Sequence, residues 1–486
     1  QGYLNHHVFC NYGGILRELG NLKEAELFTR KAIELNTNFF EAYSNLGSIL
    51  QDRGKLEEAE LSTRKAITLN PIFAIAHYNL GSILRDRGKL EEAELSTRKA
   101  IELNPNHADA HVNLGQIMRD LGNLKAAELS LRKAIDLKPD YAKAYESLGL
   151  ILLNQGKEEL SLKYFSESAN LLRIKTNKEY DPKKFITISQ AKIRHDIEQF
   201  EYLVSQGYET NKFTDLANLY KKVDAEIKWP SETELISLSK NHQNLLKGNY
   251  NMLLHKIEAP KLNKKVVNDF LDVERITNNY FDHEYGLTYI DDFLSLTALA
   301  SLRKFLLEST IWFNVKPNGY LGAFLREGFA NPLIFQIADE LRNKFPKIFK
   351  NYPINHIWAF KYDSRSKNTS SLLKGINVHA DFAAVNVNFW ITPNEANLNS
   401  DSGGLIVYDV EAPIDWNFQT YNNNETRIRE ELKKSKGNTK VIPHKENRAV
   451  VFNSNLFHET DNYEFKEGYE NRRINVTILF GERIYK

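Results

Sequence analysis

The sequence predicts a multidomain α + β protein with an N-terminal α-solenoid over 1–175, a helical connector over 176–285 and a C-terminal antiparallel β domain over 286–486. Three observations support this prediction. A 34-residue period runs through the first third, helical spacing of apolar residues without that period follows, and short alternating strands at turn-length spacing come last. With 486 residues, the chain is also too long to fold around one core.

Composition narrows the classes of partner and compartment. Lys plus Arg (64) almost balance Asp plus Glu (63), so no global field attracts a polyanion and nucleic acid is not an expected partner. Cys10 is the only cysteine, which excludes an intrachain disulfide framework and fits a reducing compartment such as the cytoplasm. No apolar run approaches the length of a membrane span, so no membrane partner is expected.

The period is carried by small residues and by prolines. The same 34-residue step relates Gly13, Gly47, Gly81, Gly115 and Gly149, then Ala25, Ala59, Ala93 and Ala127, and finally Pro71, Pro105 and Pro139. This pattern resembles the tetratricopeptide repeat. The resemblance implies five helix pairs stacked into a solenoid with a concave surface, over 6–39, 40–73, 74–107, 108–141 and 142–175. The period starts almost at Gln1, which leaves open whether further repeats precede it.

One asparagine recurs in the first helix of the units, at Asn11, Asn45, Asn79 and Asn113. In peptide-binding members of the repeat family, the matching asparagine lines the concave groove and hydrogen-bonds an extended chain. The resemblance therefore implies a groove for a protein or peptide lined by Asn45, Asn79 and Asn113. The alternative is that these asparagines cap or brace neighbouring helices.

The connector shows helical spacing of apolar residues in 184–203 and 213–223 but no pattern that indicates chemistry. His195 and Asp196 are adjacent in the sequence, so their side chains leave opposite sides of an element. We expect them to be a surface pair rather than metal ligands.

The chemistry of the C-terminal part centres on the stretch 375–393, which holds His379 and Asp381 two residues apart in β-type sequence. Side chains at that spacing leave the same face of a strand. One imidazole and one carboxylate supply two ligands of a 2-His-1-carboxylate iron(II) site. The third ligand is expected on a late strand, where His458 is the candidate, although a histidine in an apolar strand is more often simply packed.

An anchor for an anionic co-substrate is expected on the last strand. Arg473, Asn475 and Thr477 share one face of that strand, while Arg472 falls on the other face with apolar residues. A planar guanidinium binds a remote carboxylate as a fork. We therefore predict Arg473 as the anchor, with Asn475 beside it, and Arg472 as an outward surface residue.

Three segments together resemble the 2-oxoglutarate and iron(II) dependent dioxygenases, in the branch that includes prolyl hydroxylases: H-A-D at 379–381, L-F-H-E-T at 456–460 and Arg-x-Asn at 473–475. The resemblance covers roughly Tyr289 to Arg483. It implies a double-stranded β-helix, or jelly roll, with iron(II) on the two histidines and the aspartate and with 2-oxoglutarate as co-substrate. The family usually has Arg-x-Ser where this chain has Arg-x-Asn.

Further pocket residues follow from the resemblance and from alternation. In some prolyl-hydroxylase relatives a tyrosine on the preceding strand touches the co-substrate carboxylate, and Tyr362 is the matching residue. Asn386, Asn388 and Trp390 alternate along the next strand, which makes Asn388 and Trp390 candidates for substrate binding. The alternatives are a core aromatic for Tyr362 and core packing for Trp390.

The resemblance implies an enzyme that hydroxylates a side chain of a protein or peptide held by the repeats. Related halogenases lack the carboxylate ligand, so the retained Asp381 favours hydroxylation. Two alternatives stay open: the same chemistry on a small metabolite or glycan, and an interaction scaffold with an inactive oxygenase-like domain. The sequence leaves the position of a lid open, and the insertion between Val410 and Asn438, rich in Asn, Glu and Lys, is the best candidate for a mobile flap.

Overall fold

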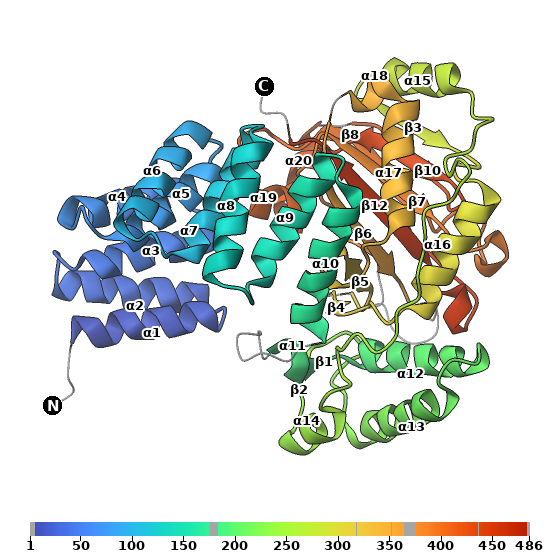
Figure 1. The fold of residues 1–486 in the computed structure, drawn as a ribbon, viewed down its shortest axis with the longest axis horizontal. Helices are drawn as coiled ribbons and strands as arrows, with labels where there is room; N and C mark the ends of the chain where they lie inside the picture. Colours follow the sequence, from blue (N-terminus) through green and yellow to red (C-terminus); the bar gives the residue numbers. More distant parts are fainter. Residues whose placement is uncertain are drawn as a thin grey trace. The chain divides into compact units, whose positions relative to one another are not determined.

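The computed structural model describes residues 5–174, 183–316, 318–350, 352–363, 375–435 and 437–483. The chain divides into two compact units (Figure 1). The first unit comprises 1–155 with 417–419, and the second comprises 156–416 with 420–486.

The first unit is a run of antiparallel helix pairs in which each helix packs against the next. Its helices are α1 (His6–Glu18), α2 (Leu22–Leu35), α3 (Phe40–Asp52), α4 (Leu56–Leu69), α5 (Ala74–Asp86), α6 (Leu90–Leu103), α7 (Ala108–Asp120), α8 (Leu124–Leu137) and α9 (Ala142–Asn154). The periodic glycines allow close crossing within a pair: a Cβ on Gly47 would clash with Thr63 Oγ1. At the pair turn, Gly54 adopts a φ of 72°, which favours glycine.

The helix expected to complete the fifth pair, α10 (Glu158–Arg173), belongs to the second unit. It packs against the short helix η1 (Leu325–Glu327) and against α17 (Pro332–Lys344). Arg173 and Glu327 form an ion pair of 2.5 Å, with side chains 1% and 0% exposed. The predicted boundary between solenoid and connector, at 175, lies outside the described residues.

The connector region is helical, as its apolar spacing predicts. It contains α11 (Lys183–Ile186), β1 (Thr187–Ile188), α12 (Gln190–Ser205), α13 (Thr210–Glu226), β2 (Ile236–Ser237), α14 (Lys240–Leu246) and α15 (Val273–Asp282). The prediction that His195 and Asp196 are a surface pair is wrong, because α12 packs against α16 (Leu296–Glu308) and near Tyr469 and so buries both residues. Asp196 is paired with Lys192 at 2.6 Å.

Two antiparallel sheets form the β-rich part of the second unit (Figure 1). The seven-stranded sheet has the order β3-β10-β7-β12-β6-β5-β4, and the three-stranded sheet has the order β11-β8-β9. The strands are β3 (Leu287–Ile290), β4 (Asn314–Val315), β5 (Leu321–Phe324), β6 (Ile354–Lys361), β7 (Val385–Trp390), β8 (Leu405–Glu411), β9 (Thr439–Ile442), β10 (Ala449–Asn453), β11 (Leu456–Thr460) and β12 (Ile474–Phe480). Strands β7 and β12 are buried along their whole length, which places them at the centre of the core.

The remaining short helices in the second unit are α18 (Pro346–Phe349), η2 (Asn394–Ala396) and η3 (Tyr469–Asn471), and the insertion after β8 holds α20 (Glu425–Ser435). Helix α19 (Phe418–Asn423) begins at the 417–419 segment. Ile428 of α20 and Tyr421 lie in one apolar cluster with Val378, Ala380 and Phe457. The insertion therefore packs against the H-A-D segment through Tyr421 and Ile428.

Candidate metal centre

His379 and Asp381 lie on an extended segment just before β7. The expectation of a continuous strand is wrong here: His379 forms only an isolated β-bridge with His458. The His379 N–H donates to the His458 carbonyl at 2.9 Å, and the His458 N–H donates back at 2.8 Å. The Asp381 N–H donates to the Ser454 carbonyl at 3.0 Å. Main-chain hydrogen bonds thus bring the three predicted ligands together without a shared strand.

The three side chains converge as a facial set. Ligand atoms of His379, Asp381 and His458 all lie within 4.8 Å of one another, and all three residues are buried. His379 Nε2 is 3.9 Å from one Asp381 oxygen, and His458 Nε2 is 3.5 Å from the other. Two imidazoles and one carboxylate in this arrangement are a donor set for a divalent transition metal such as iron(II).

Hydrogen bonds behind the ligands orient them. His379 Nδ1 is 2.8 Å from the Asn377 carbonyl and His458 Nδ1 is 3.0 Å from the Leu456 carbonyl, so each Nδ1–H donates to the backbone. That tautomer leaves both Nε2 atoms free to bind a metal. Asn386 donates to Asp381 Oδ2 at 2.6 Å and leaves Oδ1 open. Sequence reasoning placed Asn386 near the pocket but gave it no role.

The charges of the ligands suit metal binding. Burial, together with the neighbouring His458, lowers the pKa of His379 to about 4, so its imidazole is neutral at neutral pH. Burial alone would raise the pKa of Asp381, but the nearby imidazoles of His458 and His379 and the hydrogen bond from Asn386 lower it below its usual value. The site therefore presents a neutral His379 imidazole and an ionised Asp381 carboxylate, the forms that coordinate metals.

Arg473 is a buried cation in the same cavity. It is 2% exposed, its Nε donates to the Gly403 carbonyl at 2.7 Å and its Nη2 donates to the Gly404 carbonyl at 3.0 Å. Its Nη1 lies 3.4 Å from Asn475 Oδ1, and its guanidinium stacks over the Tyr362 ring at 4.5 Å. No carboxylate in the described part of the chain lies within ion-pair distance of it. Burial accordingly lowers its pKa.

The predicted pocket residues divide into those that line the cavity and those that do not. Tyr362, Asn388, Arg473 and Asn475 line it with the three metal-ligand candidates, and Thr460, Thr477, Ile376 and Leu405 are further lining residues. Trp390 does not line it; its ring is 0% exposed and packs in a core cluster with Leu405, Val450 and Phe452. Tyr362 combines both alternatives, because it also packs in an aromatic cluster with Phe360 and Tyr463.

The cavity is small. Its volume is about 20 Å³, which is room for about one water molecule. A five-carbon diacid would therefore require lining side chains to move, as often happens when a ligand binds.

The prediction for Arg472 is wrong. It is 2% exposed rather than a surface residue, and it donates to Glu198 of α12 at 2.7 Å and lies 3.6 Å from Asp363. Glu198 lies on α12, 274 residues earlier in the chain, so no local pattern could reveal this burial.

The repeat asparagines donate within the solenoid. Asn45 donates to Cys10 Sγ at 3.1 Å and Asn79 donates to Ser44 Oγ at 3.0 Å, each bridging to the previous pair. Asn113 is 5% exposed and donates to Thr97 Oγ1 at 3.2 Å. These hydrogen bonds support the alternative that the asparagines brace neighbouring helices.

Comparisons with known proteins match the first unit. Family profiles described as tetratricopeptide repeat match residues 6–39, 28–60, 74–107 and 97–128, and one described as TPR repeat matches 115–156. No curated protein matches the chain at the significance required. The N-terminal part of the chain therefore consists of tetratricopeptide repeats, which confirms the prediction from the 34-residue period. Such repeats imply a role in protein–protein interaction or scaffolding.

Several solved structures are similar to about a third of the chain. A crystal structure of MamA is 30% identical, covers 32% of this chain and 91% of its own, and has a TM-score of 0.29. TTC0263, a thermophilic TPR protein of Thermus thermophilus, is 23% identical over 33% of this chain and 89% of its own, with a TM-score of 0.31. YrrB, described as a TPR protein with an unusual peptide-binding site, is 23% identical. The match covers 34% of this chain and 84% of YrrB, with a TM-score of 0.28.

Among the described residues, no helix is both long enough and apolar enough to cross a membrane.

Proposed function

We propose that the second unit is an iron(II) and 2-oxoglutarate dependent dioxygenase that hydroxylates a side chain of a protein or peptide. The main support is the convergence of His379, Asp381 and His458 with both imidazole Nε2 atoms left free by backbone hydrogen bonds. The seven-stranded and three-stranded antiparallel sheets are compatible with a double-stranded β-helix around this site.

The buried cation supports 2-oxoglutarate as the co-substrate. Burying a charge without a counter-charge is costly, and the described residues offer Arg473 no carboxylate partner. An incoming dicarboxylate would supply the missing charge, with one carboxylate on the guanidinium. When bound, iron(II) and 2-oxoglutarate supply the oxidation of an unactivated C–H bond by dioxygen. His379, Asp381 and His458 would hold the metal, and Arg473 would hold a carboxylate of the co-substrate.

The repeats support a polypeptide substrate. Tetratricopeptide repeats bind protein or peptide partners, and a solenoid can hold an extended chain. YrrB is described as having a peptide-binding site, although its likeness to this chain concerns the repeats alone. Asn45, Asn79 and Asn113 do not support peptide binding, because their side-chain amides already donate to neighbouring helices. An interaction scaffold is the second candidate, favoured by the repeats themselves.

Metal binding and co-substrate turnover test the enzyme. We expect the full chain to bind one Mn(II) or iron(II) ion, and to release succinate slowly with iron(II), ascorbate and 2-oxoglutarate. Replacing His379 by Ala should weaken metal binding by about 100-fold or more, because one ligand is lost. The matched control is His242→Ala in α14, since His242 pairs with Glu226 away from the site.

Arg473→Ala should separate co-substrate binding from metal binding. We expect the KM for 2-oxoglutarate to rise at least tenfold while Mn(II) affinity changes little, and Arg473→Lys to restore part of the loss. Absence of both metal binding and succinate release by the wild-type chain would leave the scaffold as the function.

A further inference from the structure

The cavity at the metal centre is lined by two buried polar atoms that the protein leaves unsatisfied. Among its lining residues, Trp358 Nε1 and Asn386 Oδ1 are buried and have no hydrogen-bond partner in the described part of the chain. The first atom is a donor and the second is an acceptor. Because buried polar groups are almost always paired, each of these atoms indicates a partner that comes from outside the protein.

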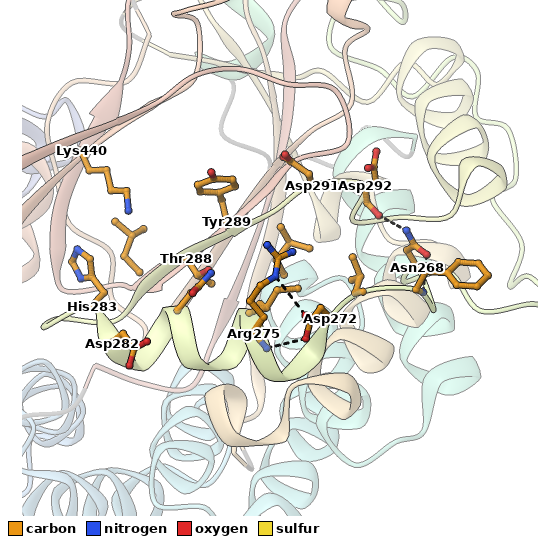
Figure 2. A pocket seen from close by; sticks show the side chains of 16 residues that line it. Asn268, Asp272, Arg275, Asp282, His283, Thr288, Tyr289, Asp291, Asp292 and Lys440 are labelled. Atoms are coloured by element: carbon orange, nitrogen blue, oxygen red, sulfur yellow. Dashed lines mark hydrogen bonds and ion pairs between the residues drawn. The ribbon is translucent and has the colours of Figure 1, made fainter.

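A second, larger cavity lacks this feature. It measures about 850 Å³ and lies along β3 and α15 (Figure 2). Figure 2 shows Arg275 beside Asp272, and the Asn268 amide donates to the Asp292 carbonyl at 2.9 Å. None of the described residues that line this cavity has a buried side-chain polar atom without a partner. The small cavity at the metal centre is therefore the one with unmet hydrogen bonds.

Asn386 presents its acceptor in a fixed orientation. The residue is 1% exposed, and its Nδ2 donates to Asp381 Oδ2 at 2.6 Å. The reverse orientation of the amide would place Oδ1 against the Asp381 carboxylate, where neither group can donate. Oδ1 is therefore held beside a candidate metal ligand and requires a donor.

Trp358 presents the donor from β6. Its ring is half-buried and contacts Phe324 and His356, which are also half-buried, with centroid separations of 6.5 and 6.4 Å. The N–H of Trp390 is unpaired too, but that ring packs in the core and does not line the cavity. Trp358 therefore combines an unpaired N–H with a place between the metal cavity and partly exposed aromatic side chains.

The register of the seven-stranded sheet places both side chains on one face. Trp358 of β6 lies opposite Thr477 of β12, and Thr477 lies opposite Asn388 of β7, which shares its face with Asn386. Strands that are two apart in a sheet are separated by about 10 Å. Asn388 donates to Thr477 Oγ1 at 3.2 Å, so these two polar groups satisfy each other. The unpaired donor and acceptor therefore face the cavity from strands on either side of β12.

A ligand that pairs with both atoms carries an acceptor and a donor. A carboxylate, such as either end of 2-oxoglutarate, has no donor for Asn386, and an ammonium has no acceptor for Trp358. A hydroxyl combines both functions in one oxygen, whereas side chains from strands about 10 Å apart are matched better by a carbonyl and an N–H on neighbouring atoms. The group with that arrangement is an amide.

We infer that Trp358 and Asn386 bind an amide group of the substrate, next to the carbon that is oxidised. The indole N–H donates to the amide carbonyl, and the amide N–H donates to Asn386 Oδ1. This amide site rests on the proposed function and deepens it, because it defines the substrate as amide-bearing. The amide is that of the polypeptide backbone or of an asparagine or glutamine side chain, which share this chemistry. The cavity of about 20 Å³ widens to admit it, as for the co-substrate.

Small amides test this site on the full chain. The chain is loaded with 2-oxoglutarate and with Mn(II), a paramagnetic ion that broadens the NMR signals of molecules bound near it. N-methylacetamide represents the backbone, acetamide represents a side-chain carboxamide, and N,N-dimethylacetamide keeps the carbonyl but has no N–H. Each is added at roughly 100 mM, because so small a ligand binds weakly. The Mn(II) affinity of every variant is measured first by calorimetry, which separates loss of the amide from loss of the metal.

We expect N-methylacetamide or acetamide to be broadened about fivefold more than N,N-dimethylacetamide, because a site with a buried acceptor rejects a ligand that leaves it unpaired. Direct coordination to Mn(II) predicts the opposite order, since the dimethyl compound has the more basic carbonyl. The more strongly broadened of the first two amides identifies the source of the amide in the substrate.

Trp358→Phe keeps an aromatic ring and removes the donor, so it should reduce the broadening of the preferred amide about fivefold. Trp229→Phe is the matched control, because that indole N–H already donates to Asp224 at 2.8 Å in the connector. The comparison of the three amides uses the wild-type chain, so the test stays valid even if Trp358→Phe does not fold.

Equal broadening of the three amides, or undiminished broadening in Trp358→Phe, would overturn the amide site and leave the two atoms to a resident water molecule. If the chain binds Mn(II) and releases succinate but broadens none of the amides, the amide site is wrong while the proposed function stands. A chain that binds no Mn(II) would overturn both.

Discussion

At the scale of single residues, Arg473 and His444 show two ways of burying a basic side chain. Arg473 donates to two carbonyls and retains its charge, whereas neither ring nitrogen of His444 has a hydrogen-bond partner among the described residues. The His444 ring lies 5.7 Å from Trp390 and 5.1 Å from Phe465, centroid to centroid. Burial, with the charges of Arg473 and Arg448, lowers the pKa of His444 to about 3. It is buried as a neutral, nearly apolar ring.

This burial predicts a pH dependence of stability. The unfolded chain protonates His444 below about pH 6.5, while the folded chain resists protonation until about pH 3. His444 therefore has no effect on the free energy of unfolding above about pH 6.5. As the pH falls below this value, it lowers the free energy of unfolding by up to about 1.4 kcal/mol per pH unit. We expect His444→Phe to be as stable as wild type at pH 7.5 and to lose less stability by pH 5, measured by urea unfolding. An identical pH slope in both proteins would contradict this.

Residue identity was the part of the site that sequence predicted best. Alternation and residue type pointed to His379, Asp381, His458 and Arg473, and the structure brings all four to one small cavity. The same reasoning failed for Arg472, because the helix that buries it comes from the distant connector. It also assigned no function to Asn386, whose contact with Asp381 depends on how the segment turns before β7.

At the scale of elements, the insertion after β8 is tied to the ligand-bearing segments. The Ala380 N–H donates to the Tyr421 carbonyl at 2.9 Å, and Asn422 donates to the Ala380 carbonyl at 2.9 Å. On α20, Arg429 binds both oxygens of Glu459, the residue after His458, at 2.8 and 2.5 Å. Sequence suggested a flap because the few apolar residues of the insertion, such as Ile428, are scattered among charges.

The Arg429–Glu459 pair predicts an effect on the metal site. Arg429→Ala should leave Glu459, which is largely buried, without its bidentate partner and loosen β11 at His458. We expect Mn(II) affinity, measured by calorimetry, to fall severalfold, and Arg429→Lys to recover part of it. Arg427→Ala is the control, since Arg427 lies on the same helix and pairs with the exposed Glu430. Equal affinities for the two alanine variants would show that the insertion does not support the site.

At the scale of the whole molecule, the period predicted the repeats and the alternation predicted antiparallel strands. Neither pattern revealed the order of the strands, since β10 pairs with both β3 and β7 across long stretches of chain. Nor did the period show that α10 packs in the second unit, because its spacing continues that of the repeats while its partners, η1 and α17, are more than 150 residues away.

The position of α10 predicts how the chain can be shortened. A chain of residues 156–486 keeps α10, and we expect it to retain Mn(II) binding and slow succinate release while losing capture of the substrate. A chain of residues 174–486 lacks α10 and with it the buried Arg173–Glu327 ion pair and the packing of α10 on η1 and α17, and breaking a buried pair typically costs about 3–5 kcal/mol. Calorimetric melting should therefore show a much lower transition for the shorter chain. Equal transitions would contradict the role of α10.

The Arg173–Glu327 pair also limits where repeats can be gained or lost during evolution of the chain. Gain or loss of whole 34-residue units before Gly156 leaves both partners of the pair in place, so duplication and deletion there preserve the second unit. A fusion or recombination joint placed a single helix later would separate the arginine from the glutamate. The permissive junction of this protein therefore lies before α10, within a repeat by sequence and between units by structure.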